Sequence, residues 1–144
     1  MTQPCIFCAI VKGEAPASVV YRDDMVIAFM DIRPANPGHV LVVPLEHADG
    51  ILDISDEAVL ARMFSVERRV AAALTDSGVL LEGFNLFLAN GTVAGQTVFH
   101  VHLHVLPRFT GDGLGLTRNA NVRMPSQSDL DEVAQRLRRA GGWE

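Results

Sequence analysis

The stretch His100-Val101-His102-Leu103-His104-Val105-Leu106 decides the fold of this chain. Imidazole and aliphatic side chains alternate along it, which is the period-two pattern of a β-strand with two unlike faces. We therefore expect a strand from residue 97 to residue 106, ended by Pro107. The three histidines would share one face of that strand, opposite Val101, Leu103 and Val105.

The spacing of the three histidines indicates which chemistry they serve. On a straight strand the first and third imidazoles start about 13 Å apart, too far to close around one metal ion with bonds of about 2 Å. The row instead flanks the middle imidazole, His102, with two others. A histidine nucleophile needs one neutral nitrogen toward the substrate and the other nitrogen's proton held by an acceptor. We expect His102 to attack phosphorus.

Two other interpretations fit the row less well. A strand whose polar face merely meets water seldom carries three histidines in strict alternation within an apolar segment. A His-x-His metal oxygenase or cupin needs a carboxylate nearby. The first acidic residue after His104 is Asp112, which lies beyond Pro107 in a glycine-rich loop.

A glycine-rich segment, residues 90–97, directly precedes the histidine row. Gly91 and Gly95 would let backbone N–H groups approach an anion, which predicts a phosphate cradle. Thr97 is then placed to donate a hydrogen bond to a leaving group, and Asp31 to accept one from a ribose diol. The apolar residues expected against a base are Val26, Ile27 and Phe29.

The rest of the chain predicts an antiparallel α+β meander. Further strands are expected at residues 19–22, 25–31, 39–43 and 84–89, and a short helix at 5–12. A long helix is expected after Ser55, because the apolar residues that follow form one stripe on a helical face. Ser55 would be its N-cap, and Gly78 would end it. These stripe residues are Val59, Met63, Val66, Val70 and Leu74. A shorter amphipathic helix is expected at 128–140.

Length and charge exclude several classes of protein. The chain has 144 residues and a formal charge of −5, which fits one domain over 1–144 and disfavours a general nucleic-acid binder. Its longest apolar run, residues 40–45, is too short to span a bilayer. The first residues lack the basic start and apolar stretch of a signal peptide, so we expect a cytoplasmic protein without a membrane partner.

The two cysteines, Cys5 and Cys8, form a Cys-x-x-Cys motif. A structural disulfide is unusual in the cytoplasm, which leaves a metal site or a redox pair. A redox pair usually opens a helix after a buried strand, whereas this motif lies at the N-terminus. The position favours a metal, provided that two more ligands exist.

Taken in order, these segments resemble the histidine triad (HIT) family of nucleotide-binding hydrolases and transferases, in its Hint-like, or protein-kinase-C-interacting-protein-like, bacterial branch. The intact His104 separates the chain from the branch that has glutamine there. The segments that carry the resemblance are residues 5–8, 28–32, 38–44, 95–98 and 100–106.

The resemblance implies a five-stranded antiparallel sheet, paired in a homodimer into ten strands. It implies that His102 is the nucleophile, flanked by His100 and His104 and supported by His39. The residues implied at the base and ribose are Phe29, Asp31 and Ile32, and those implied at the phosphate are Asn90, Gly95, Gln96 and Thr97. Some bacterial members bind a structural zinc, for which the ligands here would be Cys5, Cys8, His47 and His100.

The implied reaction is attack on the α-phosphate of a purine nucleoside 5′-phosphoramidate or related conjugate, through a nucleotidyl-histidine intermediate. The amine leaves, and water then releases AMP or GMP without a catalytic metal. The alternatives are a dinucleoside polyphosphate hydrolase and a nucleotide-binding regulatory protein. Residues 107–144 are the segment in which family members differ most.

Overall fold

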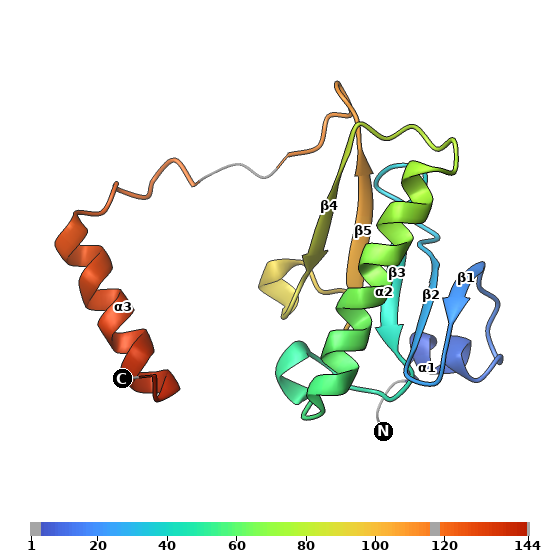
Figure 1. The fold of residues 1–144 in the computed structure, drawn as a ribbon, viewed down its shortest axis with the longest axis horizontal. Coiled ribbons are helices and arrows are strands. Elements are labelled where there is room, and N and C mark those ends of the chain that lie inside the picture. Colours follow the sequence, from blue (N-terminus) through green and yellow to red (C-terminus); the bar gives the residue numbers. More distant parts are fainter. Residues whose placement is uncertain (1–3, 116–118, 144) are drawn as a thin grey trace. The chain divides into compact units, whose positions relative to one another are not determined.

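The computed structural model describes residues 4–115 and 119–143, and its contacts divide the chain into two units, 1–112 and 113–144. The first unit holds one antiparallel sheet of five strands in the order β1-β2-β3-β5-β4 (Figure 1). The strands are β1 Val19–Arg22, β2 Val26–Met30, β3 Val40–Pro44, β4 Gly83–Leu88 and β5 Leu103–Arg108. The predicted α+β class and five-stranded antiparallel sheet are confirmed. The single domain over 1–144 stays a prediction.

The long helix α2, Glu57–Thr75, lies across one face of the sheet (Figure 1). Its buried apolar residues pack against alternate residues of the central strands β2, β3 and β5. The other face of the sheet is covered near the N-terminus by α1, Ile6–Val11, through Phe7. Strands β2 and β3 are therefore buried on both faces, which explains their unbroken apolar sequences.

The start of α2 differs by one residue from the prediction. Asp56, not Ser55, is the N-cap, and its side chain accepts a hydrogen bond from the Ala58 N–H. Asp and Ser cap helices about equally well, so the sequence alone does not choose between adjacent candidates.

The predicted strand 97–106 is wrong at both ends. Strand β5 begins at Leu103, because pairing with β3 runs only from Leu103 to Val105. Before it, the chain follows the loop after β3, where the Val101 N–H donates to the Ala48 carbonyl. Pro107, expected to end the strand, lies within it opposite Phe84. Proline is tolerated there because β5 has left β3 and is paired on one side only.

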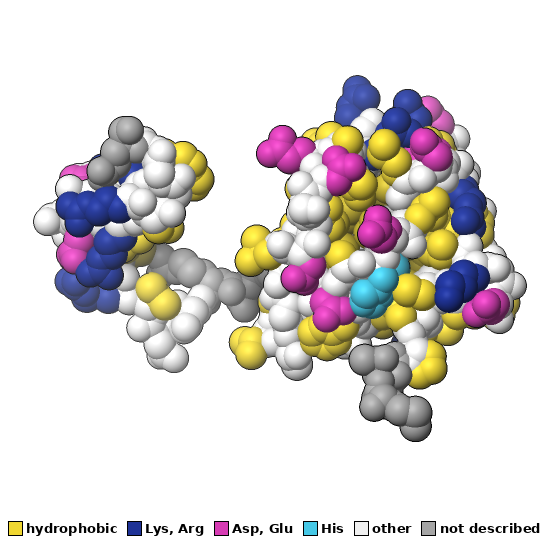
Figure 2. Space-filling view, turned by 90° about the horizontal axis from the view of Figure 1, so that it is seen from below, with side chains coloured by type: hydrophobic (Ala, Val, Ile, Leu, Met, Phe, Trp, Pro, Cys, Tyr) yellow, Lys and Arg dark blue, Asp and Glu magenta, His cyan; other side chains and the backbone are white. Residues whose placement is uncertain are grey.

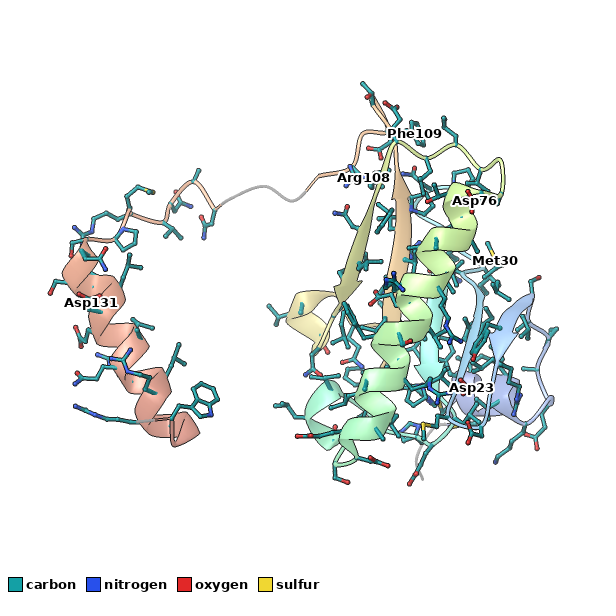
Figure 3. All side chains as sticks on the ribbon, in the orientation of Figure 1. Asp23, Met30, Asp76, Arg108, Phe109 and Asp131 are labelled. Atoms are coloured by element: carbon teal, nitrogen blue, oxygen red, sulfur yellow. The ribbon has the colours of Figure 1, made fainter. Side chains whose placement is uncertain are left out.

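The second unit contains the predicted amphipathic helix, α3, Gln127–Gly141. Ser126 and Asp129 form a capping box at its start, and Gly142 ends it in a left-handed conformation. Its side chains, including the labelled Asp131, are drawn in Figure 3. In the part of the chain that the structure describes, no helix is long and apolar enough to cross a membrane.

Candidate functional site

The three histidines of the row do not share one strand. His104 lies in β5, whereas His100 and His102 lie in the irregular segment that precedes it. The prediction that all three side chains line one strand face is therefore wrong, because the β3–β5 pairing ends at Leu103 and does not reach His100 or His102. His100 and His102 are nonetheless buried, at 0% and 5% exposure, so each needs hydrogen-bond partners.

The backbone of the row holds His102 in one tautomer. Its Nδ1 lies 2.8 Å from the carbonyl oxygen of His100, which can only accept, so Nδ1 carries the proton. Nε2 is left with a lone pair, and His102 lines the main cavity. Burial lowers the pKa of His102, and the hydrogen bond to the His100 carbonyl offsets only part of this effect. The imidazole is thus neutral and of fixed orientation, with the Nε2 lone pair that a nucleophile requires.

A second chain of hydrogen bonds gives His104 the opposite role. The Ala35 N–H donates to Nδ1 of His39, at 3.2 Å, so Nε2 of His39 carries that ring's proton. This Nε2 donates to Nδ1 of His104 at 2.9 Å, and therefore Nε2 of His104 is protonated. Asp31 lies 3.6 Å from Nδ1 of His39, too far for a competing hydrogen bond. His104 also lines the cavity, so it offers an N–H donor beside the lone pair of His102.

Burial keeps this relay uncharged. Burial, followed by repulsion from His102 and His39, lowers the pKa of His104 to about 4. Burial also lowers the pKa of His39, although the Asp31 carboxylate opposes it. At neutral pH the site therefore presents imidazoles, not imidazolium ions.

The cavity beside the two imidazoles has a volume of about 540 Å³, within the range of small-ligand sites. Most of its wall is apolar, and the predicted base and ribose residues Phe29, Asp31 and Ile32 all line it. Of the other two residues expected against a base, Val26 packs beneath α2 on the opposite face, and Ile27 lies in the core behind the wall.

Several wall residues were missed by the sequence analysis. Helix α1 contributes Ile6, Phe7 and Ile10, and Arg33 lies beside Asp31 at a polar part of the wall. The spacing of residues 6, 7 and 10 is that of one helical face, so the predicted helix at 5–12 carried the signal. Nothing in the sequence indicated that this face would meet the histidine row.

The glycine-rich segment reaches the cavity at one end. Thr97 lines the wall as predicted, together with Val98. Gln96 is buried and braces the loop, because its amide donates to the Asp49 carbonyl and accepts from the Gly91 N–H. Asn90 accepts a hydrogen bond from the Ile51 N–H at 2.7 Å.

The backbone N–H groups of the same segment form hydrogen bonds inside the loop. The N–H groups of Gly95 and Gln96 donate within the loop, to the carbonyls of Thr92 and Gly91. Gly95 has a φ of +97°, a conformation that favours glycine at this turn. The described structure thus brings Thr97, but not Asn90, Gly95 or Gln96, to the cavity wall.

The four residues implied as zinc ligands come together at the other end of the row. Their donor atoms all lie within 4.8 Å of one another. Nδ1 of His100 lies 3.4 Å from Sγ of Cys5 and 3.5 Å from Sγ of Cys8, and Nδ1 of His47 lies 3.3 Å from Sγ of Cys8. A tetrahedral zinc ion with ordinary bonds separates sulfur from nitrogen by about 3.6 Å. The donor set therefore fits zinc.

The orientation of both histidines supports the same conclusion. Nε2 of His100 lies 2.8 Å from the Pro44 carbonyl, and Nε2 of His47 lies 2.7 Å from the Asp49 carboxylate. Each Nε2 therefore carries the proton, which leaves the Nδ1 lone pair for a metal, as is usual for metal-bound histidines. Figure 2 shows a face on which histidine atoms reach the surface near acidic and hydrophobic side chains. His47 is the exposed member of the set.

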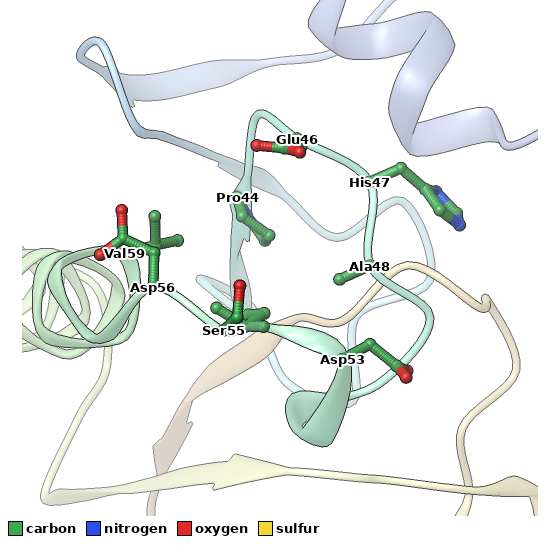
Figure 4. Close-up of a pocket in the computed structure, with 9 residues that line it drawn as sticks. Pro44, Glu46, His47, Ala48, Asp53, Ser55, Asp56 and Val59 are labelled. Atoms are coloured by element: carbon green, nitrogen blue, oxygen red, sulfur yellow. The ribbon is translucent and has the colours of Figure 1, made fainter.

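A smaller cavity, of about 90 Å³, lies between the loop after β3 and the start of α2 (Figure 4). Pro44, Ala48 and Val59 are among the residues that line it. His47 also lines this cavity, while its ring extends toward Cys8, whose Sγ lies 3.3 Å from Nδ1. The small cavity therefore adjoins the candidate metal site through His47.

The comparisons with known proteins agree with this geometry. The HIT domain model matches residues 12–111, and the chain belongs to the HIT family. An uncharacterised HIT-like protein of Methanocaldococcus jannaschii is 41% identical over 138 residues, which cover 93% of this chain and 98% of that protein. The adenosine 5′-monophosphoramidase of Schizosaccharomyces pombe is 38% identical over 113 residues, covering 78% of this chain and 80% of the relative.

Solved structures extend the similarity over nearly the whole chain. A HIT family protein from Bacillus anthracis has a TM-score of 0.87 and 35% identity, covering 97% of this chain and 99% of that one. A zinc-bound histidine triad family protein from Mycobacterium smegmatis has a TM-score of 0.72 and 39% identity, covering 94% and 96%. Both similarities combine a shared fold with substantial sequence identity.

Proposed function

We propose that this protein hydrolyses purine nucleoside 5′-phosphoramidates or related conjugates through a nucleotidyl-His102 intermediate. One observation carries the proposal. Two imidazoles with opposite Nε2 states, a lone pair on His102 and an N–H on His104, line one cavity. The similarity to the monophosphoramidase of Schizosaccharomyces pombe supports the substrate class.

In the first step, Nε2 of His102 attacks the α-phosphorus. A nitrogen–phosphorus bond forms to the histidine, the bond to the substrate amine breaks, and the amine takes a proton from solvent. The modified imidazole carries a positive charge, which the His100 carbonyl stabilises through Nδ1–H. The N–H of His104 donates a hydrogen bond to the phosphoryl group or the leaving nitrogen as charge develops there.

In the second step, water attacks phosphorus on the face that the amine left. The bond to His102 breaks, the water gives one proton to solvent and keeps the other on the phosphate, and the nucleoside monophosphate leaves with the neutral imidazole restored. Each step is an in-line displacement that inverts phosphorus, so the configuration is retained overall. Splitting one difficult displacement into two is the benefit of a histidine nucleophile.

The cavity wall supports a nucleotide as the ligand. The apolar side chains of Phe29 and Ile32 suit a base, and the Asp31 carboxylate beside them suits a ribose diol. Arg33, next to Asp31, favours one alternative, a dinucleoside polyphosphate hydrolase, because a cation there suits a substrate with further phosphates. A regulatory role of nucleotide binding also remains a prediction.

We also propose that Cys5, Cys8, His47 and His100 hold a zinc ion. Four protein ligands close the coordination sphere, so the metal would be structural and would leave the reaction to the imidazoles. The zinc-bound relative from Mycobacterium smegmatis supports this assignment.

A homodimer is the assembly that the sheet supports best. Strand β4 is at the edge of the sheet, and Phe84 on it is 43% exposed. Phe64 on α2 is 61% exposed. An open edge strand that carries an exposed aromatic side chain suits pairing with a second copy. The cytoplasmic location, and the absence of nucleic-acid and membrane partners, stay predictions.

The test is steady-state hydrolysis of adenosine 5′-phosphoramidate beside diadenosine tetraphosphate, with the parent protein and with His102→Ala. We expect AMP release from the phosphoramidate and its loss in the variant. Preference for the tetraphosphate would establish the alternative hydrolase. Nucleotide binding without His102-dependent turnover of either compound would refute the enzymatic proposal for these substrates.

A further inference from the structure

A stacked pair of rings joins the edge strand β4 to the histidine site. Phe87 on β4 and His104 on β5 are direct cross-strand partners. Their ring centroids lie 4.2 Å apart, and the ring planes are only 6° from parallel. Leu41, the partner of His104 on β3, lines the cavity from the same face of the sheet. Phe87 therefore covers one flat face of the His104 imidazole.

The other contacts of His104 leave one motion of its ring open. The hydrogen bond from His39 fixes Nδ1, and the His102 ring lies 4.8 Å away at a tilt of 53°. Rotation of the ring about its Cβ–Cγ bond displaces Nδ1, and the single hydrogen bond to His39 opposes it only modestly. Such a turn would move Nε2 away from the cavity. A parallel ring stacked on the imidazole opposes this motion.

We propose that Phe87 is a positioning residue that holds the His104 imidazole in the orientation presenting Nε2 to the cavity. The effect on rate rests on the proposed function, whereas the effect on the ring does not. Within residues 4–115 and 119–143, the residues that line the cavity do not include Phe87. Phe87 would therefore act through His104 and not through contact with the substrate.

The same strand offers a matched control. Phe84 also lies on β4, with 43% exposure against 39% for Phe87. Its partner on β5 is Pro107, three positions from His104. Because side chains alternate along a strand, Phe84 lies on the α2 side with Leu86, which packs against the core there. A change at Phe84 perturbs the edge strand equally but leaves the stack intact.

The experiment compares Phe87→Leu, Phe87→Tyr and Phe84→Leu with the parent protein. Steady-state kinetics with adenosine 5′-phosphoramidate give kcat and KM, and light scattering checks the oligomeric state. The ¹⁵N chemical shifts of the histidine rings report the tautomer and ring environment of His104 without any substrate. The charged or titratable groups that face His104, which are His39, His102 and Asp31, are present in every variant.

We expect Phe87→Leu to lower kcat about tenfold, because the interaction energy of one aromatic stack corresponds to about a tenfold change in rate. KM should stay within about twofold of the parent, since the cavity wall is unchanged. The ¹⁵N shifts of His104 should move toward the average of the two tautomers. Phe87→Tyr, which keeps a flat ring, should restore both properties, and Phe84→Leu should change neither.

Two results would overturn the proposal. The first is parental kcat and parental His104 shifts in Phe87→Leu. The second is an equal loss in Phe84→Leu, which would assign the effect to the edge strand as a whole. If the parent does not hydrolyse the phosphoramidate, the proposed function fails, and the ¹⁵N shifts alone still decide whether Phe87 holds the ring.

Discussion

Replacement of Glu67 by glutamine is expected to remove a pH-dependent weakness of the fold. Glu67 lies on the buried side of α2 with 1% exposure. Its Oε1 has no hydrogen-bond partner among the residues that the structure describes. Burial raises the pKa of its carboxyl from 4.5 to about 7. The folded protein therefore holds this proton over a pH range in which the unfolded chain has released it.

The sign and size of the effect follow from proton linkage. Below pH 4.5 both states are protonated, and the carboxyl costs no stability through ionisation. Between pH 4.5 and 7 the folded state binds more protons than the unfolded state, so the free energy of unfolding falls as pH rises. Above pH 7 the loss levels off at about 3 kcal/mol, because each unit of pKa shift corresponds to about 1.4 kcal/mol.

Urea denaturation at pH 4.5 and at pH 8 measures this loss. Between the two pH values, the parent should lose about 3 kcal/mol more than Glu67→Gln, which has no carboxyl to ionise. Glu57→Gln, an exposed change in the first turn of the same helix, should keep the parental pH dependence. Equal pH dependence in the parent and Glu67→Gln would refute the assignment of a buried proton to Glu67.

Three further outcomes are expected. His102→Ala should lower kcat by at least a thousandfold, as measured by AMP release, and a stereolabelled substrate should give retained configuration. Since the pKa of His104 is lowered to about 4, kcat should stay level as pH falls from 8 to about 5 and drop as pH approaches 4; a drop centred near pH 6.5 would contradict a buried, neutral His104. Elemental analysis should find about one zinc per chain. Cys8→Ser or a strong chelator should remove the zinc and lower the melting temperature. An unchanged melting temperature after metal loss would contradict a structural role.

The sequence was most informative where local pattern and final environment agree. The stripe of α2 and the strands β1 to β4 fall close to where apolar periodicity places them. The period-two pattern of the histidine row failed before Leu103, because two loops that meet there impose their own hydrogen bonds on the backbone. Residue types alone do not reveal such a long-range contact.

The sequence predicts which residues belong to the site better than it predicts the contacts between them. The imidazole row and the Cys-x-x-Cys motif are visible in the sequence. The stack of Phe87 on His104 depends on the register between β4 and β5, which alternation leaves open. Glu67 follows the stripe residue Val66, and only the tertiary contacts of α2 bury its carboxyl.

His100 takes part in both sites through different parts of the same residue. Its side chain faces the two thiols, whereas its main-chain oxygen accepts a hydrogen bond from Nδ1–H of His102. Any amino acid supplies that oxygen, provided that the backbone keeps its path. A lineage that lost Cys5 and Cys8 could therefore exchange the imidazole at position 100 and still inherit an oriented imidazole at position 102. The two sites are free to diverge separately although they meet at one residue.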